Sequence, residues 1–196
     1  MTIDLQQFCA LTDIHGFFEQ PFNIGEYTFA TNRHLMVRVP KLEQYEIHIN
    51  GIMVESIQEM IKQAEKAKDF IPLVDWEKPE LKECIDCAGT GRVDKCKKCN
   101  GAGELSQAYA EPCEDCDTSG VVPGTEKDCH YCNGKGKRYG FFKPCLIGNE
   151  IYACAEYIAL IESLPNPFVD ISGKPEDVIP FKFTGGIGLL MPMSKD

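Results

Sequence analysis

Four similar phrases set the architecture of this chain. They are CIDCAGTG at 84–91, CKKCNGAG at 96–103, CEDCDTSG at 113–120 and CHYCNGKG at 129–136. Each phrase places two cysteines three positions apart and follows them with glycine. In the third phrase Thr118 stands where the other three have their first glycine. Eight of the eleven cysteines lie in these phrases, so the repeat is the dominant chemical feature of the sequence.

Thiolate pairs at this spacing indicate a metal site. A CxxC pair grips an ion from one side, and a structural zinc ion takes four ligands in a tetrahedron. Four pairs therefore predict two all-cysteine sites and two Zn²⁺ ions per chain. The predicted ligands are Cys84, Cys87, Cys96, Cys99, Cys113, Cys116, Cys129 and Cys132. A redox dithiol is the competing interpretation, but such a site needs one CxxC at the start of a helix, and these four lie among glycines.

The pattern CxxCxGxG resembles the cysteine-rich zinc-binding domain of the DnaJ chaperone family, over about residues 82–138. The resemblance implies a V-shaped β-hairpin finger in which repeat one pairs with repeat four and repeat two with repeat three. Sequential pairing, one with two and three with four, stays open because the gaps between repeats are short. No HPD tripeptide of a J-domain occurs in the chain. Chaperone-like binding of unfolded peptides by the finger, without J-domain activity, is the alternative function.

The flanking residues predict an α+β fold with helices on an antiparallel sheet. Helical spacing of apolar residues predicts a short helix near residue 5 and longer helices over 54–70 and 149–165. Alternating or apolar stretches predict strands at 27–40, 46–49, 141–148, 168–172 and 178–193, with a hairpin turn at Gly185–Gly186. Because strands resume after the repeats, 1–78 and 141–196 are predicted to form one discontinuous domain, with 79–140 as an inserted finger.

Four stretches of the flanks resemble one domain of a bacterial DNA polymerase sliding clamp, in that family's order. They are FATNRHLMVRVP (29–40), INGIMVESIQEMI (49–61), LIGNEIYACAEYIALIESLP (146–165) and GIGLLMPM (186–193). Asn32 and Arg33 stand where the family commonly has Asp and Gly. The resemblance implies a single clamp-like domain, able to form a ring only as a homo-oligomer, and a groove for partner peptides. The matching groove positions are Thr31, His34, Met191, Pro192 and Met193.

The functional expectation is a non-enzymatic protein- or DNA-interaction module in DNA replication or related transactions. No GxxxxGK[ST], GxSxG or HExxH motif occurs in the chain. The net charge of -10 argues against indiscriminate phosphate binding, so a protein or peptide is the first candidate partner and DNA the second. The candidate phosphate contacts are Lys95, Lys97, Lys98, Lys135, Lys137 and Arg138. With no export signal or apolar run long enough to span a bilayer, we expect a cytoplasmic protein without a membrane partner.

Overall fold

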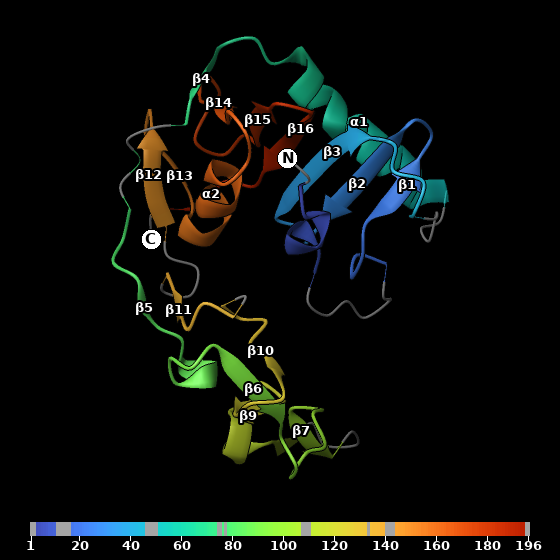
Figure 1. Cartoon of the computed structure of the whole chain (residues 1–196). Coiled ribbons are helices and arrows are strands. Elements are labelled where there is room, and N and C mark those ends of the chain that lie inside the picture. Colours follow the sequence, from blue (N-terminus) through green and yellow to red (C-terminus); the bar gives the residue numbers. More distant parts are fainter. Residues whose placement is uncertain are drawn as a thin grey trace. The chain divides into compact units, whose positions relative to one another are not determined.

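The computed structural model of the chain describes residues 3–10, 17–45, 51–73, 76, 78–106, 111–132, 134–139 and 144–194, apart from the side chains at positions 52 and 106. The chain forms two compact units (Figure 1). Met1–Lys78 and Phe142–Asp196 make the first, which we call the α+β unit, and Pro79–Phe141 makes the second, which we call the finger. Among the described helices, none has the length and apolar character needed to cross a membrane.

The α+β unit is built around a seven-stranded antiparallel sheet with strand order β1-β2-β3-β16-β15-β14-β4. Among the described residues, two α-helices and one 3₁₀ helix accompany the sheet, so the fold is α+β as predicted. The elements are η1 (Leu5–Phe8), β1 (Phe22–Ile24), β2 (Tyr27–Thr31), β3 (Leu35–Pro40), α1 (Gly51–Lys66), β4 (Phe70–Pro72), β12 (Pro144–Gly148), β13 (Ile151–Cys154), α2 (Ala155–Glu162), β14 (Phe168–Asp170), β15 (Ile179–Phe183) and β16 (Gly186–Leu190).

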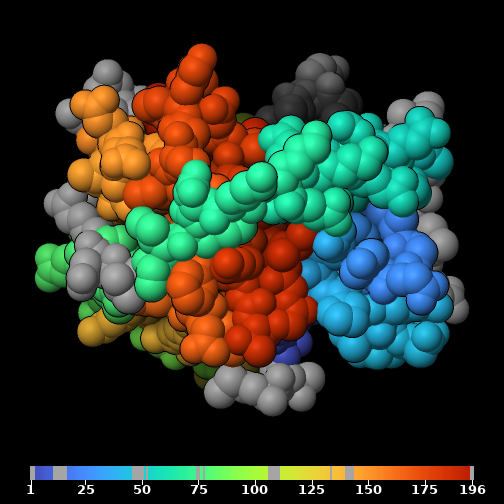
Figure 2. All heavy atoms as spheres, turned by 90° about the horizontal axis from the view of Figure 1, so that it is seen from above, coloured from blue at the N-terminus to red at the C-terminus, as the bar shows by residue number. Residues whose placement is uncertain are grey.

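Most side chains on both faces of the central strands are buried, although Arg38 is only partly buried and Lys182 is exposed. On one face, Phe29, Met36 and Leu189 form a core cluster with Ile57 and Ile61 of α1. Figure 2 shows α1 (teal) crossing over the C-terminal strands (red) toward the N-terminal strands (blue). Strand alternation sends the neighbouring residues to the opposite face. That face is also buried, and η1 contacts it at β2 and β3.

The register of β15 and β16 follows from a two-residue hairpin turn. Phe183 pairs with Gly186, so Thr184 and Gly185 form the turn, and Gly185 has a φ of +101°. The predicted hairpin is confirmed, with its turn one residue earlier than expected. Gly188 lies opposite Phe181, where an added Cβ would sit 2.2 Å from the Phe181 ring. The glycine therefore makes room for a fully buried aromatic side chain.

Of the two longer helices predicted from the sequence, one is confirmed and the other is partly wrong. The helix expected over 54–70 is present as α1 (Gly51–Lys66). The helix expected over 149–165 is wrong in its first part, because Ile151–Cys154 forms strand β13, paired with β12. Asn149 and Glu150 both adopt positive φ and turn the chain between these strands. The strand predicted at 46–49 lies outside the described residues.

The described part of the finger consists of short strands and two 3₁₀ turns, η2 (Ile85–Cys87) and η3 (Glu114–Cys116). The chain runs out through β5 (Lys82–Glu83), β6 (Arg92–Lys95) and β7 (Glu104–Ser106), and it returns through β8 (Glu111–Pro112), β9 (Val121–Pro123), β10 (Lys127–Asp128) and β11 (Lys137–Arg138). β5 pairs with β11, β6 pairs with both β10 and β9, and β7 pairs with β8. Strands of two to four residues bury too little apolar surface to hold this unit together, so other interactions must do so.

Candidate functional site

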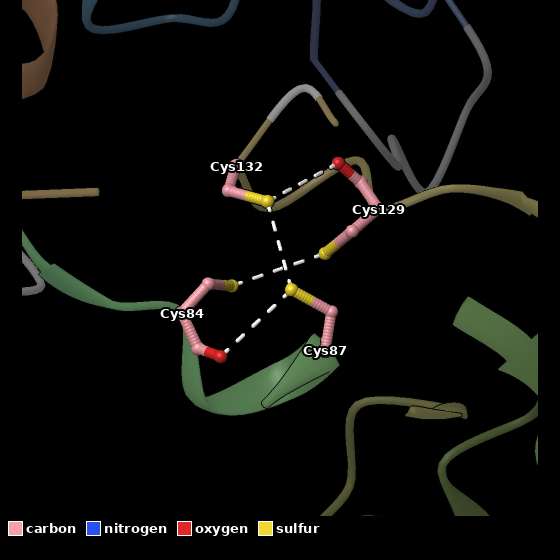
Figure 3. A group of neighbouring side chains, drawn as sticks. All are labelled: Cys84, Cys87, Cys129 and Cys132. Carbon is pink, nitrogen blue, oxygen red and sulfur yellow. Dashed lines mark hydrogen bonds between the residues drawn. The ribbon is translucent and has the colours of Figure 1, made fainter. Parts of the chain in front are cut away.

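The eight repeat cysteines converge in two groups of four. Cluster 1 contains Cys84, Cys87, Cys129 and Cys132, and cluster 2 contains Cys96, Cys99, Cys113 and Cys116. Within each cluster the four sulfur atoms lie within 4.8 Å of one another. Figure 3 shows the cluster 1 side chains pointing toward a common centre. Repeat one therefore meets repeat four and repeat two meets repeat three, which excludes sequential pairing.

The sulfur spacing fits a tetrahedral metal ion. With Zn–S bonds of about 2.3 Å, each edge of a ZnS₄ tetrahedron is about 3.8 Å long. In cluster 1 the Cys84–Cys129 and Cys87–Cys132 sulfur distances are 3.9 and 3.8 Å. In cluster 2 the distances across the two equivalent pairs are 3.9 and 3.7 Å. Both groups could hold a metal ion with four thiolate ligands and little movement of the chain.

Backbone hydrogen bonds fix each half of a cluster to the other half. In cluster 1 the Cys84 N–H donates to the Gly136 carbonyl, at 2.9 Å, and the Cys129 N–H donates to the Gly91 carbonyl, at 2.8 Å. Cluster 2 repeats this arrangement with the Cys96 N–H on Gly120 and the Cys113 N–H on Gly103, each at 2.9 Å. Each cluster thus has an approximate twofold symmetry, in which the first cysteine of one repeat bonds the last glycine of its partner.

The last glycine of a repeat also donates a hydrogen bond to a cysteine sulfur of the same repeat. The N–H groups of Gly91, Gly103 and Gly136 donate to the sulfurs of Cys87, Cys99 and Cys132, at 3.2 to 3.3 Å. Hydrogen bonds of this kind stabilise a thiolate that ligates a metal. An added Cβ at Gly91 or Gly136 would lie 2.2 Å from a carbonyl oxygen of the partner repeat, so no side chain fits.

The first glycine of each repeat carries a weaker constraint. Gly89, Gly101 and Gly134 have φ between 73° and 80°, but an added Cβ would meet only side-chain atoms. Thr118 occupies this position in the third repeat with a φ of 63°. The departure from the pattern therefore leaves cluster 2 intact, because a residue other than glycine can adopt this conformation at modest cost.

One thiol in each cluster, Cys87 in cluster 1 and Cys99 in cluster 2, has a lowered pKa. Burial opposes ionisation of Cys99, but the Gly103 N–H and the neighbouring thiols donate to its sulfur and bring its pKa down to about 7. Cys87 has a lowered pKa for the same reasons, with Gly91 as the donor. Burial raises the pKa of Cys129 to about 11 and that of Cys116 to about 12. A divalent cation would offset the repulsion that opposes four thiolates in one cluster.

The three cysteines outside the repeats lie apart from this chemistry. Cys9, Cys145 and Cys154 are buried in the α+β unit. Burial raises the pKa of Cys9 to about 12, and it also raises the pKa of Cys154. Cys9 and Cys154 are accordingly packing groups and poor nucleophiles.

Two of the six predicted phosphate contacts are engaged in ion pairs within the finger. Lys98 binds Asp115 at 2.6 Å, and Arg138 lies 3.6 Å from Asp86 and 5.8 Å from the centre of the Tyr131 ring. The remaining four are exposed lysines: Lys95, Lys97, Lys135 and Lys137. Contact with DNA through these residues stays a prediction.

An apolar cavity of about 180 Å³ opens in the α+β unit, between α1 and the ends of the central strands. Three of the five predicted peptide-binding residues line it: Thr31, His34 and Met191. Pro192 and Met193 do not line it; Met193 instead bonds the Tyr152 carbonyl through its N–H, at 2.8 Å. Sequence reasoning missed the cavity residues contributed by other segments, including Phe18, Met60 and Leu189.

A rigid turn between β2 and β3 supplies one wall of this cavity. The Asn32 side chain accepts hydrogen bonds from the N–H groups of His34 and Leu35, at 3.0 and 2.8 Å. The Thr31 hydroxyl donates to the Leu35 carbonyl, at 2.9 Å, and Arg33 adopts a φ of 75°. His34 stacks on Tyr157, with ring centres 6.0 Å apart. The asparagine at position 32, which departs from the clamp pattern, is thus the residue that holds the turn.

Comparison with family models, curated proteins and solved structures finds no match to this chain.

Proposed function

We propose that the protein is a non-enzymatic interaction module whose finger is folded around two zinc ions and whose α+β unit binds a partner peptide. The observation that carries the metal assignment is the pair of four-sulfur clusters with edges of 3.7 to 3.9 Å. All-thiolate tetrahedra of this size suit zinc, and four protein ligands leave no position open for catalysis.

Metal analysis of the purified protein tests this proposal. We expect two zinc ions per chain, and one per chain in Cys87→Ser, which removes a ligand from cluster 1. Cys145→Ala is the matched control, since this buried cysteine belongs to neither cluster. We also expect a chelator to unfold the finger while the α+β unit, which has its own core, stays folded. A metal content near zero in freshly purified protein would refute the assignment.

The apolar cavity supports the peptide-binding part of the proposal. Met60 and Met191, which line it, are 40% and 44% exposed, and methionine adapts its shape to varied apolar partners. The rigid turn at Thr31–Leu35 presents a preformed wall, which lowers the entropy cost of binding. A cavity of this size accepts one or two large side chains of an extended or helical peptide.

Binding can be measured by fluorescence anisotropy with labelled ten-residue peptides that carry two adjacent large apolar side chains. We expect Met191→Ala to weaken binding about tenfold, because a partly buried methionine contact contributes on the order of 1 kcal/mol or more. Met193→Ala is the matched control, since Met193 does not line the cavity. Equal losses in the two variants would place the peptide elsewhere.

A role in DNA replication or related transactions rests on the resemblance to sliding clamps. It predicts assembly into a ring of several copies and weak contact with DNA through Lys97, Lys135 and their neighbours. Light scattering and DNA binding at two salt concentrations test both points. A monomer with no affinity for DNA at low salt would remove this assignment and leave the zinc and peptide proposals standing.

Exposed apolar residues on the finger favour the alternative function, chaperone-like binding of unfolded chains. Ile85, between the two cysteines of the first repeat, is 80% exposed, and Leu81 and Leu105 are 48% and 40% exposed. If the finger binds unfolded clients, the intact protein suppresses aggregation of a denatured enzyme and Ile85→Ser suppresses it less. Failure of the zinc-loaded protein to suppress aggregation would exclude this alternative.

A further inference from the structure

The two clusters differ in how well their sulfur ligands are covered. In cluster 1, Cys84, Cys87 and Cys129 are fully buried, and Cys132 is 4% exposed. In cluster 2, Cys99 and Cys116 are 7% and 8% exposed. These two residues belong to different halves of cluster 2, so each half is covered less completely than the corresponding half of cluster 1. A chelator or thiol reagent reaches a metal–thiolate site through such exposed sulfur.

The residues around cluster 1 also cover it more completely than those around cluster 2 cover that cluster. Cluster 1 shares a hydrophobic core with Val93 and Val121, and Tyr131 packs against it. The Asp86–Arg138 ion pair beside it has side chains only 13% and 11% exposed. Among the described residues, Val122 is the one partly buried hydrophobic residue that packs against cluster 2. The ion pair on that side, Lys98–Asp115, is 45% and 54% exposed.

The clusters also join segments of different length. The sulfur pairs of cluster 1 connect residues 45 positions apart, and those of cluster 2 connect residues 17 positions apart. Opening cluster 1 frees the chain that carries the β6–β10 pairing and its neighbours. Opening cluster 2 frees only the stretch between Cys96 and Cys116, where the described strands are β7 and β8. The smaller opening requires less free energy and therefore occurs more often.

We propose, on the basis of the zinc binding proposed above, that cluster 2 is the exchangeable metal site and cluster 1 the retained one. The protein then has a defined one-zinc form. In that form cluster 1 holds the two halves of the finger together, while Cys96, Cys99, Cys113 and Cys116 are reactive thiols. The supply of zinc accordingly decides whether cluster 2 and the β7–β8 pairing are formed.

Partial removal of zinc from the intact full-length protein tests this inference. The two-zinc protein is treated with a chromogenic chelator until one equivalent of zinc is released, and then with N-ethylmaleimide. Peptide mapping is expected to find the label on the four cysteines of cluster 2, with zinc release in two phases at least tenfold apart in rate. Cys9 and Cys154 report on unfolding of the α+β unit and are expected to stay unlabelled. Label spread equally over both clusters, or found first on cluster 1, would overturn the inference.

Two valine variants test whether the hydrophobic residues around cluster 1 cause its slow release of zinc. Val93→Ala thins the core around cluster 1, so the slow phase is expected to accelerate several-fold. Val122→Ala is the matched control beside cluster 2, and the slow phase is expected to keep its rate. The test applies to variants that contain two zinc ions when purified. A protein that contains no zinc would contradict the proposed zinc binding itself, and the metal content separates that result from a failure of the present inference. An unchanged slow phase in two-zinc Val93→Ala would refute the role of covering.

Discussion

Gly136 is a position at which the geometry of cluster 1 leaves no room for a side chain, whereas Gly134, two residues earlier, has room for one. The two glycines have nearly the same φ, 71° and 73°. An added Cβ at Gly136 would lie 2.2 Å from the Gly89 carbonyl oxygen, while at Gly134 the nearest atom is 3.3 Å away in the Asp128 side chain. The pair Gly136→Ala and Gly134→Ala therefore separates a backbone clash from the cost of positive φ.

The expected magnitudes follow from the contacts. Positive φ costs an alanine about 1–2 kcal/mol at either position. At Gly136 the clash must also move the chain by about 1 Å to restore ordinary contact. That shift breaks the Cys84 N–H bond to the Gly136 carbonyl and the Gly136 N–H bond to the Cys132 sulfur. These two bonds contribute together about 3 kcal/mol, because one of them is made to a thiolate.

The difference of about 3 kcal/mol corresponds to roughly a 10²-fold difference in zinc affinity at cluster 1. Competition with a chelator of known affinity measures it, because the retained zinc can be followed per chain. Gly134→Ala is expected to lose about tenfold relative to the unmodified protein, and Gly136→Ala to lose about 10³-fold. Equal losses in the two variants would show that the close approach of the repeats is unimportant and would refute the reasoning.

Three further predictions concern other parts of the chain. Phe181→Ala removes a fully buried ring and should destabilise the α+β unit by about 3–5 kcal/mol in denaturant unfolding, while the finger keeps both zinc ions; a loss of zinc would contradict the separate cores. Asp170 has a lowered pKa, since hydrogen bonds from Ser172 and the N–H groups of residues 68 and 69 outweigh the effect of burial. Its stabilising contribution is therefore present above about pH 4 and lost as the pH falls through the folded pKa, so Asp170→Asn should flatten that part of the stability–pH curve, and an unchanged curve would contradict this. Asn32→Ala should loosen the turn beside the cavity and weaken peptide binding severalfold without unfolding the protein, as circular dichroism and anisotropy together would show; unchanged binding would contradict the role of the turn.

Local sequence patterns were sufficient to predict several elements of the fold. The spacing of apolar residues predicted α1, and the Gly185–Gly186 pair predicted the β15–β16 hairpin, because both signals act within a few residues of chain. The same kind of signal misled at Ile151–Cys154, where apolar residues at helical spacing belong to a strand. Only pairing with β12 decides that segment, and the partner strand begins seven residues earlier, at Pro144.

The sequence could identify only some of the residues that line the cavity. Thr31, His34 and Met191 could be named from a resemblance, but Phe18, Met60 and Leu189 reach the same cavity from an early loop, a helix and a central strand. No periodicity in the sequence links these positions. The order of the strands in the sheet brings them together, and that order is a property of the whole α+β unit.

The sequence by itself determined that eight cysteines form four half-sites, since a CxxC turn and its glycines are fixed by local geometry. It also determined that a thiol-rich finger interrupts an α+β chain. Only the tertiary structure decided which half-sites meet, because that choice depends on β6 pairing with both β9 and β10. The same pairing separates a fully covered, long-span cluster from a less covered, short-span one.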